Sequence, residues 1–187
     1  MRIVGGAFKG RAIVSPQGRD TRPTSDRTRE SVFNVLAHAD WSPGVEGRRV
    51  LDLFAGSGAL GLEAMSRGAA FALFVETDAA ARGAIRDNIE TLGLFGVTRI
   101  HRRDASDLGA KPAGLGDPFD LVFLDPPYGK ALGERALARL NAGGWIAPEA
   151  LIVLEVGADE NPRTEPFDIL DQRSYGAAKV LFLRLRT

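Results

Sequence analysis

The sequence predicts an α/β fold with a mostly parallel β-sheet and an antiparallel hairpin at its C-terminal end. Strand-like and helix-like segments alternate from residue 50 to residue 156, as in parallel sheets whose strands are joined by helices. Residues 119–124, FDLVFL, show no polar–apolar alternation, which is typical of a strand buried on both faces. A Gly-x-Gly-x-x-Gly turn at residues 56–61 separates a strand from a helix and favours close approach of a ligand.

Residues 1–40 are predicted to form a small extension made of a β-hairpin and a helix. Residues 2–15 favour two short strands around Lys9 and Gly10. Thr24 or Ser25 can cap the helix that follows. Its apolar face is formed by Val32, Phe33, Val35 and Leu36. Its basic residues are expected on or near the opposite face: Arg22, Arg27 and Arg29.

Residues 48–187 are predicted to form the core, after a linker with Pro and Gly at residues 41–47. Its strands are expected at residues 50–54, 70–75, 97–101, 119–124 and 151–156. Helices are expected after the glycine turn, between Asp78 and Gly93, and at residues 132–140. Residues 167–173 and 179–185 are expected to form the terminal antiparallel hairpin.

Composition excludes several kinds of site. The chain of 187 residues has no cysteine, so disulfides, thiolate metal sites and a Cys nucleophile are absent. Its two histidines do not predict a metal site. No apolar run approaches the ~20 residues of a membrane span, and the N-terminus lacks the apolar core of a signal peptide. We therefore expect a cytoplasmic protein with no membrane or metal partner.

Charge is distributed unevenly although the net charge is zero. Residues 1–36 carry seven basic and three acidic side chains, a net charge of +4, and the remainder carries −4. A basic N-terminal segment on an acidic body could bind a phosphate backbone locally. An ordinary solvated charged face would have the same composition.

Acidic residues near the strand ends indicate a cofactor with an adenosine group. Glu76 lies twenty residues after Gly56, the spacing at which a carboxylate binds ribose hydroxyls. A dinucleotide and S-adenosylmethionine both fit this pattern. Asp52, just before the glycines, would attract a methionyl ammonium but repel a pyrophosphate, which favours S-adenosylmethionine. Asp104, after the third strand, could reach an adenine amino group.

The sequence Asp125-Pro126-Pro127-Tyr128 follows the fourth strand, where ligands bind in open α/β sheets. A carboxylate and free proline carbonyls can accept hydrogen bonds from an –NH2 group, and a Tyr ring can stack on a base. An ionised Asp accepts from the adjacent N1–H and N2–H donors of guanine, whereas adenine presents an acceptor beside its amine. The motif therefore predicts a site for a planar amine.

The chain resembles class I S-adenosylmethionine-dependent methyltransferases that act on exocyclic amines. The resemblance lies in residues 51–61, Glu76, Asp104 and DPPY, in this order. Residues 22–36, RPTSDRTRESVFNVL, with RIVGGAFKGR before them, resemble the bacterial RsmD family. This resemblance covers nearly the whole chain. It implies a Rossmann-like class I methyltransferase fold, S-adenosyl-L-methionine as cofactor, and methylation of N2 of a guanine in 16S ribosomal RNA. We expect a monomer that acts on an assembling small ribosomal subunit.

These expectations assign residues to three groups. The catalytic group is Asp125, Pro126, Pro127 and Tyr128. The cofactor-binding group is Asp52, Phe54, Ala55, Gly56, Gly58, Glu76, Thr77, Asp104 and Ala105. The RNA-binding group is Lys9, Arg11, Arg22, Thr24, Arg27 and Arg29.

Three other functions are compatible with these residues. DNA adenine-N6 and protein-glutamine methyltransferases use the same amine-binding motif. A nucleic-acid-binding module without catalysis could keep the fold, although the acidic residues above argue against it. A nicotinamide oxidoreductase could use the glycine turn, but the chain has no second, substrate-binding domain.

Overall fold

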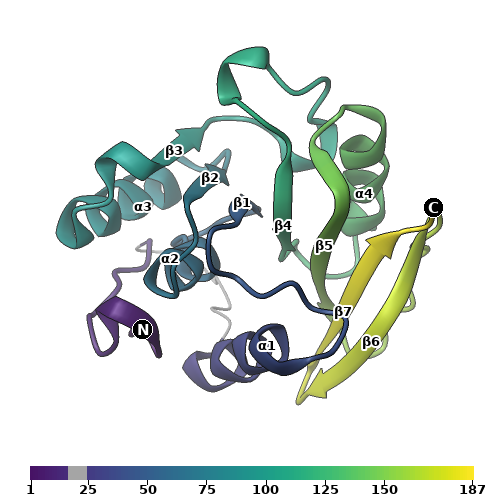
Figure 1. The fold of residues 1–187 in the computed structure, drawn as a ribbon, viewed down its shortest axis with the longest axis horizontal. Coiled ribbons are helices and arrows are strands. Elements are labelled where there is room, and N and C mark those ends of the chain that lie inside the picture. The colour runs from purple at the N-terminus through teal and green to yellow at the C-terminus, as the bar shows by residue number, and fades with distance from the viewer. Residues whose placement is uncertain (17–24) are drawn as a thin grey trace.

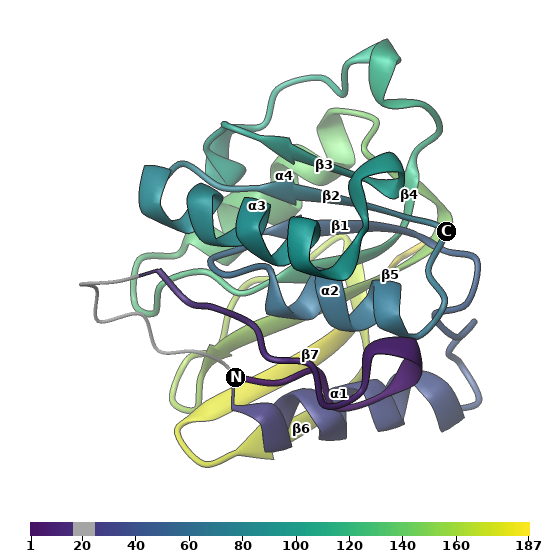
Figure 2. The same ribbon diagram turned by 90° about the vertical axis from the view of Figure 1, so that its left-hand side faces the viewer.

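The computed structural model describes residues 1–16 and 25–187, which form a seven-stranded sheet with helices on both faces (Figures 1 and 2). The strands are β1 (Arg49–Leu53), β2 (Phe71–Val75), β3 (Thr98–His101), β4 (Phe119–Leu124), β5 (Ile146–Gly157), β6 (Phe167–Tyr175) and β7 (Ala178–Leu185). Their order in the sheet is β3-β2-β1-β4-β5-β7-β6. Strands β1 to β5 pair in parallel, and β7 is antiparallel to both β5 and β6. The predicted α/β sheet with a C-terminal hairpin is confirmed.

The helices are α1 (Asp26–His38), α2 (Ala59–Ser66), α3 (Ala79–Leu92) and α4 (Leu132–Ala142). Their predicted end signals are present. Ser25 accepts a hydrogen bond from the Thr28 N–H at 3.0 Å, and Asp78 accepts one from the Ala81 N–H at 2.9 Å. Gly93 ends α3 with φ at +69°, a conformation that residues with a Cβ rarely adopt.

Helices cover both faces of the sheet, which explains the uninterrupted apolar sequence of β4. Leu121 and Phe123 belong to the hydrophobic cluster that includes residues of α1, α2 and α3. Val122 and Leu124 belong to the cluster on the other side, which includes residues of α4. Successive residues of a strand point to opposite faces, so both sets must be apolar.

The N-terminal segment (residues 1–16) lies against α2 and α3 (Figure 2). Ile3 and Ile13 are buried in the same cluster as Phe33 of α1 and Leu62 of α2. The extension therefore shares one hydrophobic core with the sheet, and the division of the chain at residues 40–48 stays a prediction.

The N-terminal segment doubles back as predicted, but its two expected strands shorten to one antiparallel bridge between Arg2 and Ala12 and a 3-10 turn at Gly6–Phe8. The reason is that α2 takes up its hydrogen-bond donors. The N–H groups of Val4 and Gly5 donate to the carboxylate of Glu63, each at 3.0 Å. These donors are then unavailable to a neighbouring strand.

Strand β5 begins earlier than predicted, at Ile146 instead of residue 151. Its first part pairs with β4 through Phe119 and Ile146, and the register shifts before Leu121. Glu149 adopts φ of +66° at this irregularity. The first part of β5 could not be predicted from the sequence, because Pro148 is unfavourable within a strand and the irregular register interrupts the strand pattern.

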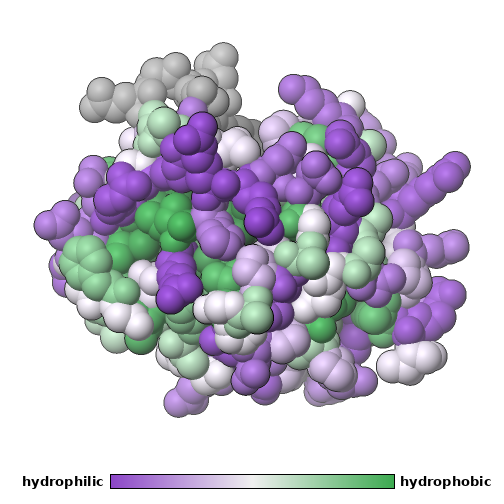
Figure 3. Space-filling model, turned by 90° about the horizontal axis from the view of Figure 1, so that it is seen from above, coloured by the Kyte–Doolittle hydropathy of each residue, from purple (hydrophilic) through white to green (hydrophobic). Residues whose placement is uncertain are grey.

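On the face seen in Figure 3, hydrophilic residues surround smaller areas of hydrophobic ones. No helix within residues 1–16 and 25–187 combines the length and the apolar character needed to cross a membrane.

Candidate functional site

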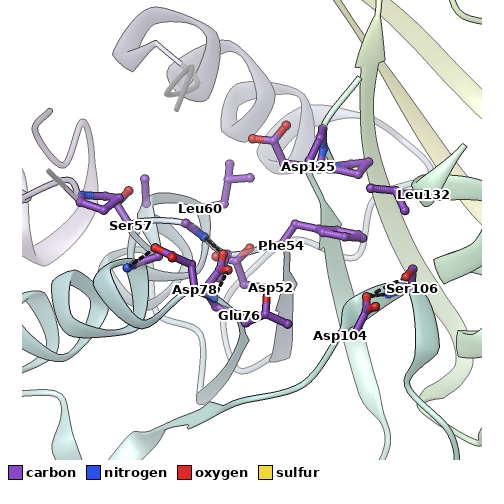
Figure 4. Close-up of a pocket in the computed structure, with 18 of the residues that line it drawn as sticks. Asp52, Phe54, Ser57, Leu60, Glu76, Asp78, Asp104, Ser106, Asp125 and Leu132 are labelled. Atoms are coloured by element: carbon purple, nitrogen blue, oxygen red, sulfur yellow. Dashed lines mark hydrogen bonds between the residues drawn. The ribbon is translucent and has the colours of Figure 1, made fainter. Parts of the chain in front are cut away.

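A cavity of about 720 Å³ lies between the ends of β1 and β4. At this point the order of the strands changes direction, since β2 and β3 follow on one side of β1 and β4 and β5 on the other. Ligands of open α/β folds bind at such a point, outside the carboxyl ends of the strands. Residues following β1, β2 and β4 line the cavity, together with Asp104 after β3 (Figure 4). Its volume falls in the range of small-molecule and cofactor sites.

The cavity collects most of the predicted cofactor-binding residues. Those that line it are Asp52, Phe54, Ala55, Gly56, Glu76, Thr77 and Asp104. Gly58 and Ala105 are outside the lining: Gly58 is the N-cap of α2 with φ of +81°, and Ala105 is buried behind Asp104.

The glycine turn brings the start of α2 close to β1 and β2. A Cβ at Gly61 would lie 2.5 Å from the ring of Phe74 and 3.1 Å from Oδ2 of Asp52. Only glycine allows this approach, and it lets the Gly61 N–H donate to Asp52 Oδ2 at 3.0 Å. The third glycine of the motif thus fixes the Asp52 carboxyl group in the floor of the cavity.

Asp52 is almost fully buried, with 1% of its surface exposed. Burial raises the pKa of its carboxyl group from 3.8 to about 8, against the hydrogen bond from Gly61, and the nearby Glu76 raises the pKa further. A cationic group of a ligand placed beside Asp52 would stabilise its ionised form. Asp52 is therefore suited to bind an ammonium group.

Glu76 follows β2 and holds two main-chain segments with one carboxylate. Oε1 accepts from the Gly56 N–H at 2.8 Å, and Oε2 accepts from the Asp78 N–H at 2.9 Å. These bonds orient the carboxylate inside the cavity (Figure 4). Each oxygen keeps further acceptor capacity that vicinal hydroxyls of a ribose could use.

Asp104 lies after β3 on another side of the cavity. Its Oδ1 accepts from both the Oγ–H and the N–H of Ser106, at 2.7 and 2.9 Å. These bonds hold the pKa of Asp104 below its usual value, and the cationic Arg135 acts in the same direction. An ionised acceptor beside the cavity suits an amino group such as that of adenine.

Phe54 directly follows β1 and adopts a left-handed conformation, with φ of +56°. Non-glycine residues in this region carry backbone strain and are frequent at functional sites. Its ring lies beside the cavity in Figure 4, where it could contact a planar ligand.

All four residues of the DPPY motif line the same cavity, directly after β4. The Asp125 carboxylate extends toward the side on which Leu60 of the glycine turn lies (Figure 4). The Tyr128 hydroxyl donates to Oε1 of the buried Glu155 on β5 at 3.0 Å, which fixes the ring at the cavity wall. The predicted catalytic residues and seven of the nine predicted cofactor-binding residues thus line one cavity.

Three of the four described RNA-binding candidates, Lys9, Arg11 and Arg27, are exposed, and each lies near the end of a different helix. Lys9 follows Phe8, whose N–H donates to Ser66 at the end of α2 away from the cavity. Arg11 is exposed and donates to the Thr91 carbonyl near the end of α3. Arg27 is exposed in the first turn of α1. Arg22 and Thr24 lie outside the described residues.

The expectation that Arg29 lies on or near the face of α1 opposite its apolar residues, where it could bind RNA, is wrong. Its side chain is fully buried, and its Nε donates to Oε1 of the equally buried Glu63 at 3.1 Å. Its Nη2 donates to Asp26 Oδ1 at 2.8 Å and to the Arg2 carbonyl. Arg29 joins α1, α2 and the N-terminal segment, and no part of it is available to a phosphate.

Several residues that line the cavity were not predicted from the sequence as part of the site. They are Met1, Ser15, Pro16, Ser57, Ala59, Leu60, Asp78, Ala81, Ser106, Leu132 and Arg135. Ser57 and Leu60 belong to the glycine motif, and Ser106 is two residues from Asp104, so proximity to a recognised motif could have indicated them. Met1, Ser15 and Pro16 reach the cavity only through long-range packing.

Comparison with known proteins agrees with this geometry. A family described as Conserved hypothetical protein 95 matches residues 1–184. Ribosomal RNA small subunit methyltransferase D of Escherichia coli K12 is 38% identical over 182 residues, which are 97% of this chain and 87% of that protein. The Haemophilus influenzae protein of the same name is 34% identical and covers 94% of this chain and 89% of its own length. The solved structure of the Escherichia coli protein yhhF superimposes with a TM-score of 0.80 at 35% identity, covering 100% of this chain and 99% of that one.

Proposed function

Because this chain belongs to the RsmD-like family (Conserved hypothetical protein 95), we propose that it transfers a methyl group from S-adenosylmethionine to the exocyclic N2 of a guanine in 16S ribosomal RNA. The observation that carries this proposal is the common cavity. Residues suited to a methionyl ammonium, a ribose and an adenine line the same space as the DPPY motif. A methyl donor and an acceptor amine can then meet without a large movement of the chain.

The cofactor half of the proposal uses three acidic residues. S-adenosylmethionine supplies a methyl group that is already activated by its bond to a sulfonium sulfur. Asp52 would bind the ammonium group, Glu76 the ribose hydroxyls and Asp104 the adenine amino group. The burial of Asp52 and the hydrogen bonds that orient the other two carboxylates support these roles.

The acceptor half uses Asp125 and its neighbours. The N2 lone pair of guanine is delocalised into the ring, so the amine must be oriented to react. Asp125 and the Pro126 carbonyl would accept its N–H bonds and direct the lone pair toward the methyl group. Tyr128, held by Glu155, would stack on the base after it leaves its own stack, which costs a few kcal/mol.

An RNA substrate is supported by the named relatives and by the charge of the N-terminal region. Both the Escherichia coli and the Haemophilus influenzae relatives are named for the small-subunit ribosomal RNA. The net charge of residues 1–36 is +4, or +3 without the buried Arg29, and would favour a phosphate backbone. We further propose that the protein acts as a cytoplasmic monomer on an assembling small subunit.

Tritium transfer from labelled S-adenosylmethionine tests the proposal. The substrates are assembling small ribosomal subunits, naked 16S RNA, duplex DNA and a protein extract, assayed side by side. We expect labelling of the 16S RNA at guanine N2, and none of DNA or protein. Label in DNA adenine or in protein glutamine would support the other amine methyltransferases, and cofactor binding without any transfer would support a module that lacks catalysis.

Two variants separate the halves of the cavity. Asp125→Ala is expected to abolish transfer while leaving the affinity for S-adenosylhomocysteine nearly unchanged. Asp104→Asn is expected to weaken cofactor binding, with activity recovering at saturating cofactor. Loss of cofactor binding in Asp125→Ala would contradict the role given to Asp125.

A further inference from the structure

The N-terminal segment, residues 1–16, forms part of the cavity wall. Met1, Ser15 and Pro16 line the cavity although they are far in sequence from every motif that predicts the cofactor site. In Figure 2 this segment runs past α2 and α3. The wall that it provides must therefore be held in place by contacts with these helices.

Asn88 of α3 holds the end of this segment nearest the cavity. Its side chain is 3% exposed. Oδ1 accepts from the Val14 N–H at 2.9 Å, and Nδ2 donates to the Val14 carbonyl at 3.0 Å. Nδ2 also donates to the carbonyl of Ser57, in the glycine turn, at 3.0 Å. One amide thus ties the residue before Ser15 to the turn that opens α2.

A second attachment holds the turn at which the same segment doubles back, around Gly6–Phe8. Ser66, in the last turn of α2, donates from Oγ to the Gly5 carbonyl at 2.6 Å and accepts from the Phe8 N–H at 3.0 Å. The eight residues of α2 separate this attachment from the glycine turn by about 12 Å. Ser66 does not line the cavity, so it provides a matched comparison for Asn88.

We propose that Asn88 is a positioning residue for the cofactor: it holds Ser15 and Pro16 against the glycine turn, where they form one wall of the cofactor site. This inference rests on the proposed binding of S-adenosylmethionine. Without the Asn88 amide, the Val14 main chain and the Ser57 carbonyl lose their partners, and the wall must be ordered again each time the cofactor binds. Ordering a segment on binding lowers affinity.

Calorimetric titration with S-adenosylhomocysteine tests the inference on the full chain. Asn88→Ala is expected to weaken binding by at least about tenfold, a loss of about 1.4 kcal/mol. Ser66→Ala also removes two hydrogen bonds to the segment, both partly buried, and is expected to lower the melting temperature. It should change the affinity by less than about twofold, since Ser66 is distant from the cavity. Asp87→Ala, at an exposed neighbour on α3, should change neither.

Steady-state kinetics give a readout that lower stability alone would not produce. For Asn88→Ala we expect a higher KM for S-adenosylmethionine with kcat nearly unchanged at saturating cofactor. Pro16→Gly, which trims the wall and keeps Asn88, should raise the same KM, so the inference can be tested even if Asn88→Ala does not fold.

Two results would overturn the inference: unchanged affinity and KM in Asn88→Ala and Pro16→Gly, or equal weakening by Asn88→Ala and Ser66→Ala. The proposed function fails separately, because a wild-type protein that binds no S-adenosylhomocysteine would contradict it before any variant is made.

Discussion

Arg29 and Glu63 form a fully buried ion pair, with 3.1 Å between Nε and Oε1. Glu63 also accepts hydrogen bonds from Val4, Gly5 and Arg67, so one carboxylate of α2 joins α1 and the N-terminal segment to the core. This pair explains why a basic residue of α1 is a structural element instead of an RNA contact.

Removing Arg29 is therefore expected to destabilise the fold. Arg29→Ala removes one of the two cationic partners of the buried Glu63 and leaves Arg67 as the other. The free energy of unfolding should therefore fall by about 3 kcal/mol, the low end of the range for a broken buried ion pair. Urea denaturation measures this change. Arg27→Ala, two residues away on the exposed face, should change stability by no more than about 0.5 kcal/mol. Equal stability of the two variants would contradict the structural role of Arg29.

Arg27 is an exposed candidate that is linked to the cavity wall through its neighbour Asp26, which is bonded to Arg2, the residue after Met1 of the lining. It lies in the first turn of α1, next to Asp26, which accepts a hydrogen bond from the main chain of Arg2. Arg27→Ala should weaken binding of 16S RNA and reduce the salt dependence of log K by about 0.7–0.9. Filter binding at several salt concentrations measures both. Lys9→Ala, near the end of α2 that is away from the cavity, should weaken RNA binding less. Unchanged RNA binding of Arg27→Ala at low salt would remove Arg27 from the interface.

Cofactor binding is expected to release a proton from Asp52. Its pKa of about 8 keeps the carboxyl group protonated at pH 7, whereas an ammonium beside it favours the carboxylate. Close to one proton should be released per S-adenosylhomocysteine bound at pH 7, and affinity should rise between pH 6 and pH 8. Titrations in two buffers of different ionisation enthalpy count this proton. Binding without proton release would contradict the role of Asp52.

The same shift affects the stability of the ligand-free protein. Folding raises the pKa of Asp52, so Asp52 adds to the free energy of unfolding at low pH. This stabilisation is fully present below its usual pKa of 3.8 and is lost as pH rises through about 8. In Asp52→Asn, stability should no longer fall over this pH range. The same variant is the control for the proton released on binding of S-adenosylhomocysteine.

Two glycines in helices should respond to alanine in opposite directions. Gly61→Ala places a Cβ 2.5 Å from the Phe74 ring and should destabilise the protein by about 1–3 kcal/mol. Gly83→Ala in α3 meets no heavy atom within 4 Å and should stabilise it by about 0.5–1 kcal/mol. Thermal denaturation compares the two. A stabilised Gly61→Ala would contradict the close packing of the glycine turn.

Local patterns were sufficient to predict the sheet and to bring the main acidic candidates together at one cavity. Strand β4 was predicted with its observed bounds. Ser25 and Asp78 cap the starts of α1 and α3, and Gly93 ends α3, as expected. The reason is that burial on both faces, capping and left-handed glycines leave signals within a few residues. The carboxyl ends of parallel strands meet at one edge, so Asp52, Glu76, Asp104 and Asp125 could be assigned to one cavity before their distances were known.

Long-range contacts could not be predicted in this way. Whether Arg29 faces water depends on Glu63, 34 residues later. Val14 is held by Asn88, 74 residues later, and a helix pattern gives no reason to select that Asn. The N-terminal strands shortened for the same reason, since their donors are bonded to α2.

Mass mapping of methylated guanines in 16S RNA tests the central claim most directly. The RNA is taken from cells that lack this protein and from the same cells supplied with the wild type or with Asp125→Ala. The account predicts that one N2-methylguanine is missing, that the wild type restores it and that Asp125→Ala does not. An unchanged set of N2-methylguanines in the deficient cells, or full restoration by Asp125→Ala, would contradict it.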